Sequence, residues 1–533
     1  MYGLKELEKA KKGNIVPVYE TMDSQQDELD FFKKISDYGK KPHSILLESA
    51  DIVTKYGEKS IGSADPCLNI IGKGDKFEIN ALNETGNRFL AAIKNDLKFC
   101  DSLKVSKNKI SGILKVKRDF MSENEKLRAK THADILRIVA FKLKPVYKPF
   151  PVFAGLFGVI AYDFIDQFEQ LPKNKKDLLK EPDYEMNFYE NLFLVDHKKK
   201  QITFVANALI FNEEDKKSET ERCKKIIEFY KSMLTAKIPI GKKPQKIKPK
   251  ITTDTNKNKF VKIVSALKKN VLMGDVFQVV PSRTVSSTYT AEPLDIYASL
   301  RKLNPSPYMF YFQNSSGILA GSSPETFIKI AGNAEKKIEI RPIAGTRPRG
   351  FVNGKLDEKL DAKYAEELLN DVKEMAEHTM LIDLARNDVA RVSKPGTREC
   401  EKSYMIEKYS HVQHIVSSVT GILKSDLDAL YAYMASMNMG TLTGAPKVEA
   451  MKLIRLNEKT RRGFYGGSIG YLTPSGEFDS AIIIRSMSLQ KGKAYTRAGA
   501  GIVFDSVPEK EFEESERKMK ACLRAIELAE GFK

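Results

Sequence analysis

The chain contains 533 residues, of which 42% are hydrophobic and 30% are charged, and its net charge is +18. These values are ordinary for a water-soluble globular protein, and the length allows two domains. No uncharged apolar run is long enough for a membrane span, and the first residues, MYGLKELEKAKKG, lack the apolar stretch of a signal peptide. We therefore expect a cytoplasmic protein.

The cysteine content and the basic charge bear on two further protein classes. The five cysteines are odd in number and form no CxxC pair, which argues against a disulfide framework and a thiolate zinc site. Lysines are spread along the chain, without the interleaved aromatics or the Arg-bearing module of nucleic-acid-binding proteins. A nucleic-acid-binding protein is therefore the weaker alternative, and it predicts binding that falls steeply with salt.

The first part of the chain, residues 15–235, reads as mixed strand and helix. Residues 44–52, SILLESADI, predict a short strand, and residues 66–83 alternate like a hairpin around GKGD. Apolar spacing predicts a helix over 126–144. Residues 201–211, QITFVANALIF, predict a strand that leads into a charged helix.

A boundary is predicted at residues 236–257, where Lys and Pro dominate and little apolar area can be buried. This segment reads as an exposed linker before a second domain, residues 258–531. That domain begins with a helix over 258–274 and a strand over 275–285. The alternation of hairpins with long helices predicts an α+β fold, with helices outside antiparallel sheets, in preference to a parallel doubly wound fold.

The C-terminal stretch RAGAGIVFDSVPEKEFEESERKMK combines a bare loop with an acidic helix. Gly499 and Gly501 allow backbone N–H groups to approach an anion closely, and Arg497 stands beside them. The following helix carries three charged side chains on one face, at positions Glu511, Glu514 and Lys518. Taken alone, the stretch is better explained as a glycine-rich turn before a solvated charged helix.

The stretch KEMAEHTMLIDLARNDVARV predicts a helix that buries a wide apolar face. Glu377 and His378 interrupt that face, and an unpaired carboxylate there costs several kcal/mol, roughly the cost of a buried charge without a partner. Asp383 can pair with Arg386. For Glu377 the sharper interpretation is a divalent cation held by oxygen ligands from two helices, as Mg²⁺ usually is.

Three glycine-bearing loops, RPIAGTRPRG, GTLTGAPKVEAM and RRGFYGGSIGYL, and two histidines complete the candidates. None of the loops has the GxxxxGK[ST] spacing of a phosphate loop, so ATP use is unsupported. Gly345 and Thr346 offer a backbone donor and a hydroxyl. His411 and His414 point to opposite faces of an alternating strand, so at most one faces a site.

Together the motifs DVFQVVPSR, PIAGTRPRG, AEHTMLIDLARND, GTLTGAPKVEAM, GFYGGSIGYL, IIIRSM and RAGAGIV…EESERK resemble those of the chorismate-utilising enzymes. The motifs LLESAD and NPSPYMFYF narrow the resemblance to anthranilate synthase component I, the large subunit. The resemblance runs from about Ser44 to the C-terminal helix. It implies antiparallel sheets packed as a sandwich with outer helices, in two interleaved subdomains.

The resemblance also implies the ligand sites. Glu377 and Glu514 match the Mg²⁺ ligands, with Glu511 as a partner behind them. Arg485 and the backbone loop match groups that take the enolpyruvyl carboxylate of chorismate, while Mg²⁺ takes the ring carboxylate. The positions that match chorismate-binding residues are Gly345, Thr346, Tyr465, Arg485, Gly499, Ala500, Gly501 and Lys518.

The implied reaction is attack of ammonia on ring carbon C2 with departure of the C4 hydroxyl, followed by loss of pyruvate. Glu325 matches the acid that protonates the leaving hydroxyl. His414 matches the histidine of the elimination step, and Thr441 lies in the adjacent loop. Gln278 stands where isochorismate and salicylate synthases carry Lys, and Ala344 stands where many aminodeoxychorismate synthases carry Lys. Both differences favour anthranilate over the alternative product, aminodeoxychorismate.

The resemblance further implies a partner and an inhibitor. The chain contains no GxCxG glutaminase motif, so a separate glutamine amidotransferase subunit is expected to supply the ammonia. L-Tryptophan is expected as a feedback inhibitor. The residues that match its pocket are Ser49, Pro307, Tyr308 and Met309.

Overall fold

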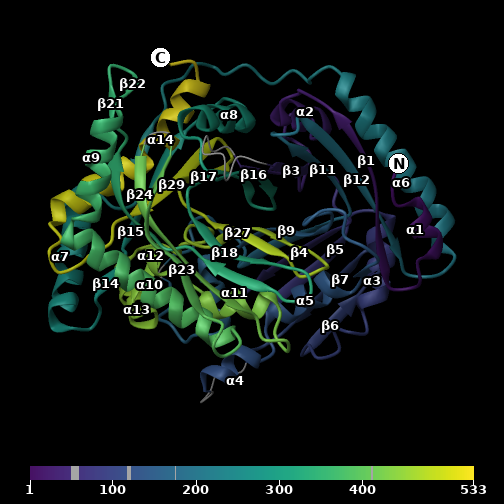
Figure 1. The fold of residues 1–533 in the computed structure, drawn as a ribbon, viewed down its shortest axis with the longest axis horizontal. Coiled ribbons are helices and arrows are strands. Elements are labelled where there is room, and N and C mark those ends of the chain that lie inside the picture. The colour runs from purple at the N-terminus through teal and green to yellow at the C-terminus, as the bar shows by residue number, and fades with distance from the viewer. Residues whose placement is uncertain (50–58, 117–121, 175, 410–411, 533) are drawn as a thin grey trace.

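The computed structural model describes residues 1–49, 59–116, 122–174, 176–409 and 412–532. Two large sheets dominate it (Figure 1). The first sheet has twelve strands, in the spatial order β13 (Ile251–Thr253), β15 (Ser282–Thr288), β29 (Lys493–Gly499), β28 (Ser486–Gln490), β17 (Gly317–Ser323), β16 (Tyr308–Asn314), β2 (Ile45–Glu48), β3 (Lys59–Ser63), β11 (Asn191–Asp196), β12 (Gln201–Ile210), β1 (Asn14–Asp23) and β8 (Lys144–Pro145).

The second sheet has thirteen strands and is antiparallel throughout its described pairs. Its order is β20 (Ile343–Pro348), β24 (Val412–Ile422), β19 (Lys337–Ile340), β18 (Thr326–Ala331), β27 (Phe478–Ile482), β26 (Ser468–Leu472), β9 (Gly155–Ile160), β10 (Tyr184–Tyr189), β4 (Leu68–Lys73), β5 (Lys76–Ala81), β7 (Lys109–Ile113) and β6 (Ser102–Val105), with β23 (Glu399–Lys408) also paired to β24. Two short ribbons stand apart, β14 (Gln278–Val279) with β25 (Gly444–Ala445) and β21 (Phe351–Val352) with β22 (Lys355–Leu356).

Helices surround the two sheets (Figure 1). They are α1 (Leu4–Lys9), α2 (Glu28–Ile35), α3 (Glu84–Ile93), α4 (Glu123–Arg128), α5 (His132–Phe141), the 3-10 helix η1 (Tyr162–Gln167), α6 (Asp215–Thr235), α7 (Lys257–Met273), α8 (Pro293–Leu303), α9 (Glu358–Leu369), α10 (Val372–Val392), α11 (Ala429–Ser436), α12 (Gly440–Thr443), α13 (Lys447–Asn457) and α14 (Pro508–Ala529). Within the described ranges, none of them is both long and apolar enough to cross a membrane.

The buried apolar residues show how the layers pack. One cluster joins Phe310 and Leu319 of the first sheet to Phe157 and Ile469 of the second, so it fills the space between the sheets. A second cluster packs α2, α6, α8 and α14 on the outer face of the first sheet. A third packs α3, α5, α10 and α11 on the outer face of the second. The α+β sandwich with outer helices is therefore confirmed.

Both sheets combine strands from the two halves of the chain. In the first sheet β16 from the second half pairs with β2 from the first, and in the second sheet β26 pairs with β9. Residues 236–250 form no helix or strand and run along the top of Figure 1, whereas β13 pairs with β15. The predicted linker is thus irregular over most of its length, and the domain limits themselves stay a prediction.

The predicted hairpin over 66–83 is confirmed as β4 and β5, but two other predicted elements are interrupted. The helix predicted over 126–144 divides into α4 and α5 because Thr131 starts a new helix. The Thr131 hydroxyl accepts a hydrogen bond from Ala133 N–H, and the Asp134 carboxylate accepts one from Thr131 N–H. The strand predicted over 275–285 divides into β14 and β15 next to Pro281, which has no N–H to donate.

Candidate active site

Gln278 lies on β14, the first part of the strand predicted over 275–285. Strand β14 stands apart from the large sheets and pairs with β25. The Gln278 amide lies against Gly501 in the loop of residues 499–501, called the glycine loop below. A Cβ atom on Gly501 would lie 2.5 Å from Gln278 Nε2, so a larger residue at 501 would displace the Gln278 amide. Gln278 Oε1 is buried without a hydrogen-bond partner in the described structure. A buried acceptor without a partner is costly, so this oxygen indicates a place for a ligand.

The glycine loop is open to a ligand only in part. Ala500 N–H donates to the carbonyl of Pro281 at 3.3 Å, so it is not available to an anion. The Gly501 N–H donates no backbone hydrogen bond among the described residues. Arg497, which stands beside the loop, donates to Glu458 Oε2 at 2.6 Å and to Ser282 Oγ at 2.8 Å. Its role is therefore to hold the loop.

Glu325 lies between β17 and β18 and is 6% exposed. Burial raises the pKa of its carboxyl to about 7, although Thr441, Lys518 and Arg485 each lower it. Glu325 Oε1 and Thr441 Oγ1 are both buried atoms without a hydrogen-bond partner in the described structure. The two groups are thus near each other without a well-formed hydrogen bond, and a carboxyl with a pKa of about 7 in such a place is suited to proton donation.

His414 connects β24 to the loop of β20. Its Nδ1 lies 2.7 Å from the carbonyl oxygen of Gly345 and 3.1 Å from Thr346 Oγ1. Because a carbonyl oxygen only accepts, Nδ1 carries the proton and Nε2 keeps its lone pair. Burial lowers the pKa of His414, and Arg485 lowers it further. The imidazole is therefore neutral and can accept a proton at Nε2.

Arg485 is the central cation of the site. Its backbone φ is +50°, a left-handed conformation that is uncommon outside glycine and is concentrated at functional positions. Burial lowers the pKa of its guanidinium, while Tyr465, Glu514 and Glu325 are close enough to raise it. No ion pair or side-chain hydrogen bond to Arg485 is found in the described ranges. A partly buried guanidinium that makes no ion pair within the described residues favours an anionic ligand.

Four carboxylates on α10 and α14 lie close enough for their charges to interact: Glu374, Glu377, Glu511 and Glu514. Burial raises the pKa of Glu377 to about 7, and Glu374, Glu514 and Glu511 raise it further. Burial raises the pKa values of Glu374 and Glu511 as well, with a further contribution from Glu514. Burial also opposes ionisation of Glu514, but Lys518 outweighs it and the pKa is lowered. Mutual repulsion of this kind is what a cation relieves.

The donor set fits a hard divalent cation, because carboxylate oxygens from two helices are what Mg²⁺ prefers. Among the described residues no three acidic, His or Cys side chains already form a complete ligand group. Instead, Lys373 Nζ lies 3.8 Å from Glu377 Oε1, and Lys518 Nζ lies 2.7 Å from Glu514 Oε1. Glu374 was not among the predicted residues. Its position one helical turn before Glu377 is the signal that would have found it.

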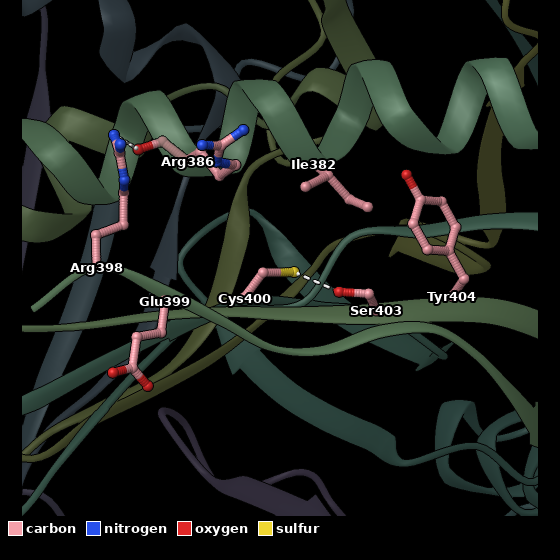
Figure 2. Close-up of a pocket in the computed structure, with 7 residues that line it drawn as sticks. All are labelled: Ile382, Arg386, Arg398, Glu399, Cys400, Ser403 and Tyr404. Carbon is pink, nitrogen blue, oxygen red and sulfur yellow. Dashed lines mark hydrogen bonds between the residues drawn. The ribbon is translucent and has the colours of Figure 1, made fainter.

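Two cavities lie near these elements. One of about 260 Å³ opens between α10 and β23, with Ile382 above Cys400 and Tyr404 (Figure 2). None of the predicted site residues lines it. The other, of about 30 Å³, borders Tyr465 and Arg497 and has room for about one water molecule. The predicted site therefore lies apart from the larger cavity.

The residues predicted to bind an inhibitor lie on neighbouring strands. Ser49 follows β2 directly, and Met309 on β16 pairs with Glu48. Pro307 is buried at the start of β16. The Tyr308 hydroxyl lies 3.0 Å from Asp479 Oδ1 and 3.1 Å from Thr326 Oγ1.

Comparison with known proteins identifies the family of this chain. Residues 99–524 match the family described as chorismate binding enzyme. That is more than half of the chain, and the chain belongs to this family.

Similar relatives narrow the group. The anthranilate synthase component 1 of Vibrio cholerae is 41% identical over 90% of this chain and 91% of its own length. That of Escherichia coli is 40% identical over 92% and 93%. The chain therefore groups with the anthranilate synthase component 1 relatives within the family.

Solved structures agree with this placement. The anthranilate synthase component I of Streptococcus pneumoniae has a TM-score of 0.68 at 28% identity and covers 88% of this chain and 92% of its own. The menaquinone-specific isochorismate synthase of Escherichia coli has a TM-score of 0.64 at 16% identity, covering 98% and 97%, and shares the fold.

Proposed function

We propose that this protein is the large subunit of an anthranilate synthase, which converts chorismate and ammonia to anthranilate and pyruvate in the cytoplasm. The single observation that carries the proposal is a set of buried side-chain oxygens without hydrogen-bond partners at three of the positions matched to the reaction. Glu325 Oε1, Thr441 Oγ1 and Gln278 Oε1 are all buried without partners in the described structure. The similarity to anthranilate synthase component 1 proteins supplies the substrate and product.

In the proposed reaction the protein binds and orients a dicarboxylate. Arg485 and the Gly501 N–H take the enolpyruvyl carboxylate, beside Tyr465. Ammonia attacks ring carbon C2, and Glu325 protonates the C4 hydroxyl, which leaves as water. In the second step a base removes the proton from C2, and the enolpyruvyl group leaves and picks up a proton to give pyruvate. His414 Nε2 is the proposed base.

We propose Mg²⁺ as the cofactor, held by Glu377 and Glu514 with Glu511 and Glu374 behind them. When bound, the cation supplies a charge clamp for the ring carboxylate of chorismate. The raised pKa values of Glu377, Glu374 and Glu511, to each of which the Glu514 charge contributes, support this assignment. Lys518 completes the proposed substrate site, because its ammonium reaches the carbonyl of Gly499 at 3.0 Å.

Glu514→Gln tests the metal assignment. We expect the Mg²⁺ concentration for half-maximal activity to rise by about 10- to 100-fold, the range seen when groups that support a metal are removed. The midpoint of thermal unfolding should stay unchanged, because Glu514 is partly exposed. The matched control is Glu513→Gln, an exposed neighbour on the same helix. An unaltered Mg²⁺ requirement in Glu514→Gln would count against this ligand.

We further propose that a glutamine amidotransferase subunit delivers the ammonia and that L-tryptophan inhibits the enzyme. The inhibitor residues are Ser49, Pro307, Tyr308 and Met309. Tyr308 offers a physical link to catalysis, because it contacts Thr326, the neighbour of Glu325. Communication between two sites requires such a connected set of contacts.

Tyr308→Phe tests the link. We expect the L-tryptophan concentration for half-inhibition to rise about fivefold or more, since both hydroxyl contacts are lost and a coupling energy of this size is typical. The control is Tyr311→Phe on the same strand, whose hydroxyl donates to the Gly39 carbonyl on the other face. Equal inhibition constants for Tyr308→Phe and the wild type would argue against the link.

Turnover of chorismate tests the function itself. The protein is incubated with chorismate, Mg²⁺ and an ammonium salt, with and without L-tryptophan, and the product is identified by fluorescence and mass. We expect anthranilate with an equal amount of pyruvate. An amine at C4 with no pyruvate would instead identify an aminodeoxychorismate synthase, the alternative function.

A further inference from the structure

Two lysine side chains form ion pairs with the two proposed ligand carboxylates. Lys518 lies four residues after Glu514 on α14, and Lys373 lies four residues before Glu377 on α10, so each pair shares a helix face. The Lys518 ammonium is 2.7 Å from Glu514 Oε1, and that of Lys373 is 3.8 Å from Glu377 Oε1. Each proposed ligand carboxylate therefore already has a positive partner.

These partners and a divalent cation would use the same oxygen atoms. The Glu514 oxygen 2.7 Å from the Lys518 ammonium is not free for a metal, and Lys373, at 3.8 Å from Glu377, opposes a metal there through its charge. Four repelling carboxylates with neither the lysines nor a cation would be unfavourable. Both lysine side chains have rotatable stems and are partly exposed, at 32% for Lys518 and 47% for Lys373. They can therefore move away without burying a charge.

Lys518 differs from Lys373 in its other contacts. Its ammonium also donates to the Gly499 carbonyl at 3.0 Å, in the loop proposed to hold the substrate. It is close enough to Glu325 to lower the pKa of that carboxyl, although burial dominates. Lys373 has neither contact among the described residues. Only Lys518 stands at the junction of the carboxylates, the glycine loop and the proposed acid.

We propose that Lys518 and Lys373 are built-in counter-ions that give up Glu514 and Glu377 when a divalent cation binds, and that the released Lys518 ammonium then pairs with the anionic substrate. The inference rests on the proposed function. Under this proposal the cation and the substrate bind cooperatively through Lys518, whereas Lys373 only competes with the cation.

The test is calorimetric titration of Mg²⁺ into the wild type, Lys518→Met and Lys373→Met, with and without chorismate. Ammonium salt is left out, so that chorismate is not consumed. Without chorismate, both variants should bind Mg²⁺ about two- to fivefold more tightly, the range expected for loss of a partly exposed ion pair. Chorismate should tighten Mg²⁺ binding in all three proteins. This gain should be about two- to fivefold smaller in Lys518→Met and unchanged in Lys373→Met.

Two results would overturn the inference. Equal Mg²⁺ affinity in all three proteins would show that the lysines do not compete with the cation. An equal loss of cooperativity in both variants would remove the special role of Lys518. A wild type that binds neither Mg²⁺ nor chorismate contradicts the proposed function instead. The midpoint of thermal unfolding in EDTA confirms that each variant is folded.

Discussion

Glu325→Gln should lower kcat for anthranilate formation by about 10²- to 10⁴-fold, the usual contribution of a positioned general acid. Glutamine keeps the size of the side chain but has no proton to give to the C4 hydroxyl. Chorismate binding, measured by calorimetry, should change little, because the carboxyl acts on the leaving group. The control is Glu335→Gln, an exposed residue paired with Lys394 on the surface, which should leave kcat unchanged.

The pH profile separates this role from a structural one. Because the pKa of Glu325 is raised to about 7, the acid loses its proton as the pH rises through this value. Wild-type kcat at saturating Mg²⁺ should therefore fall above about pH 7. In Glu325→Gln the residual rate should lack this decline. A decrease in kcat of less than fivefold, or an unchanged alkaline limb in the variant, would contradict the assignment.

Glu458→Ala should cost about 3–5 kcal/mol in the free energy of unfolding, the range for removing one partner of a buried ion pair. Glu458 is 5% exposed and accepts from Arg462 and Arg497, each at 2.6 Å. It also accepts from Ser282 N–H and Oγ at 2.8 Å. Alanine would leave two buried guanidinium groups without a counter-charge.

Urea denaturation measures this effect, and helix α13, which ends just before Glu458, provides the control. Glu449→Ala removes an exposed pair with Lys452 at 3.0 Å on α13 and should change the free energy of unfolding by less than about 1 kcal/mol. Because Arg497 and Arg462 border Tyr465, the variant should also lose chorismate affinity. A loss of stability no larger than that of Glu449→Ala would show that the cluster does not hold the loop.

The sequence predicts this fold best where the pattern is local. The hairpin over 66–83 follows from alternation around a turn, and the buried face of α10 follows from apolar spacing. The break in the helix predicted over 126–144 was missed, because the prediction used apolar spacing alone. The break comes from the capping contacts of Thr131 and Asp134, which apolar spacing does not reveal. The pairing of the two chain halves within each sheet is a long-range property that the resemblance supplied.

The candidate site shows the same limit. Residue types at fixed spacing indicated Glu377 and the glycine loop, and the resemblance added Glu514. In the structure Glu514 lies close enough to Glu377 and to Arg485 to shift the pKa of each. The sequence did not show that Arg497 is committed to Glu458, since that partner is 39 residues away. Partners that meet only after folding leave no pattern in a single sequence. His411 lies outside the described residues.

The most direct test of the account is a crystal structure of Glu325→Gln soaked with chorismate and Mn²⁺, located by anomalous scattering. Slow turnover in this variant should preserve the substrate. We predict one Mn²⁺ ion within bonding distance of both Glu377 and Glu514 and in contact with the ring carboxylate, while Arg485 holds the second carboxylate. A metal peak elsewhere, or chorismate bound away from Arg485, would contradict the account.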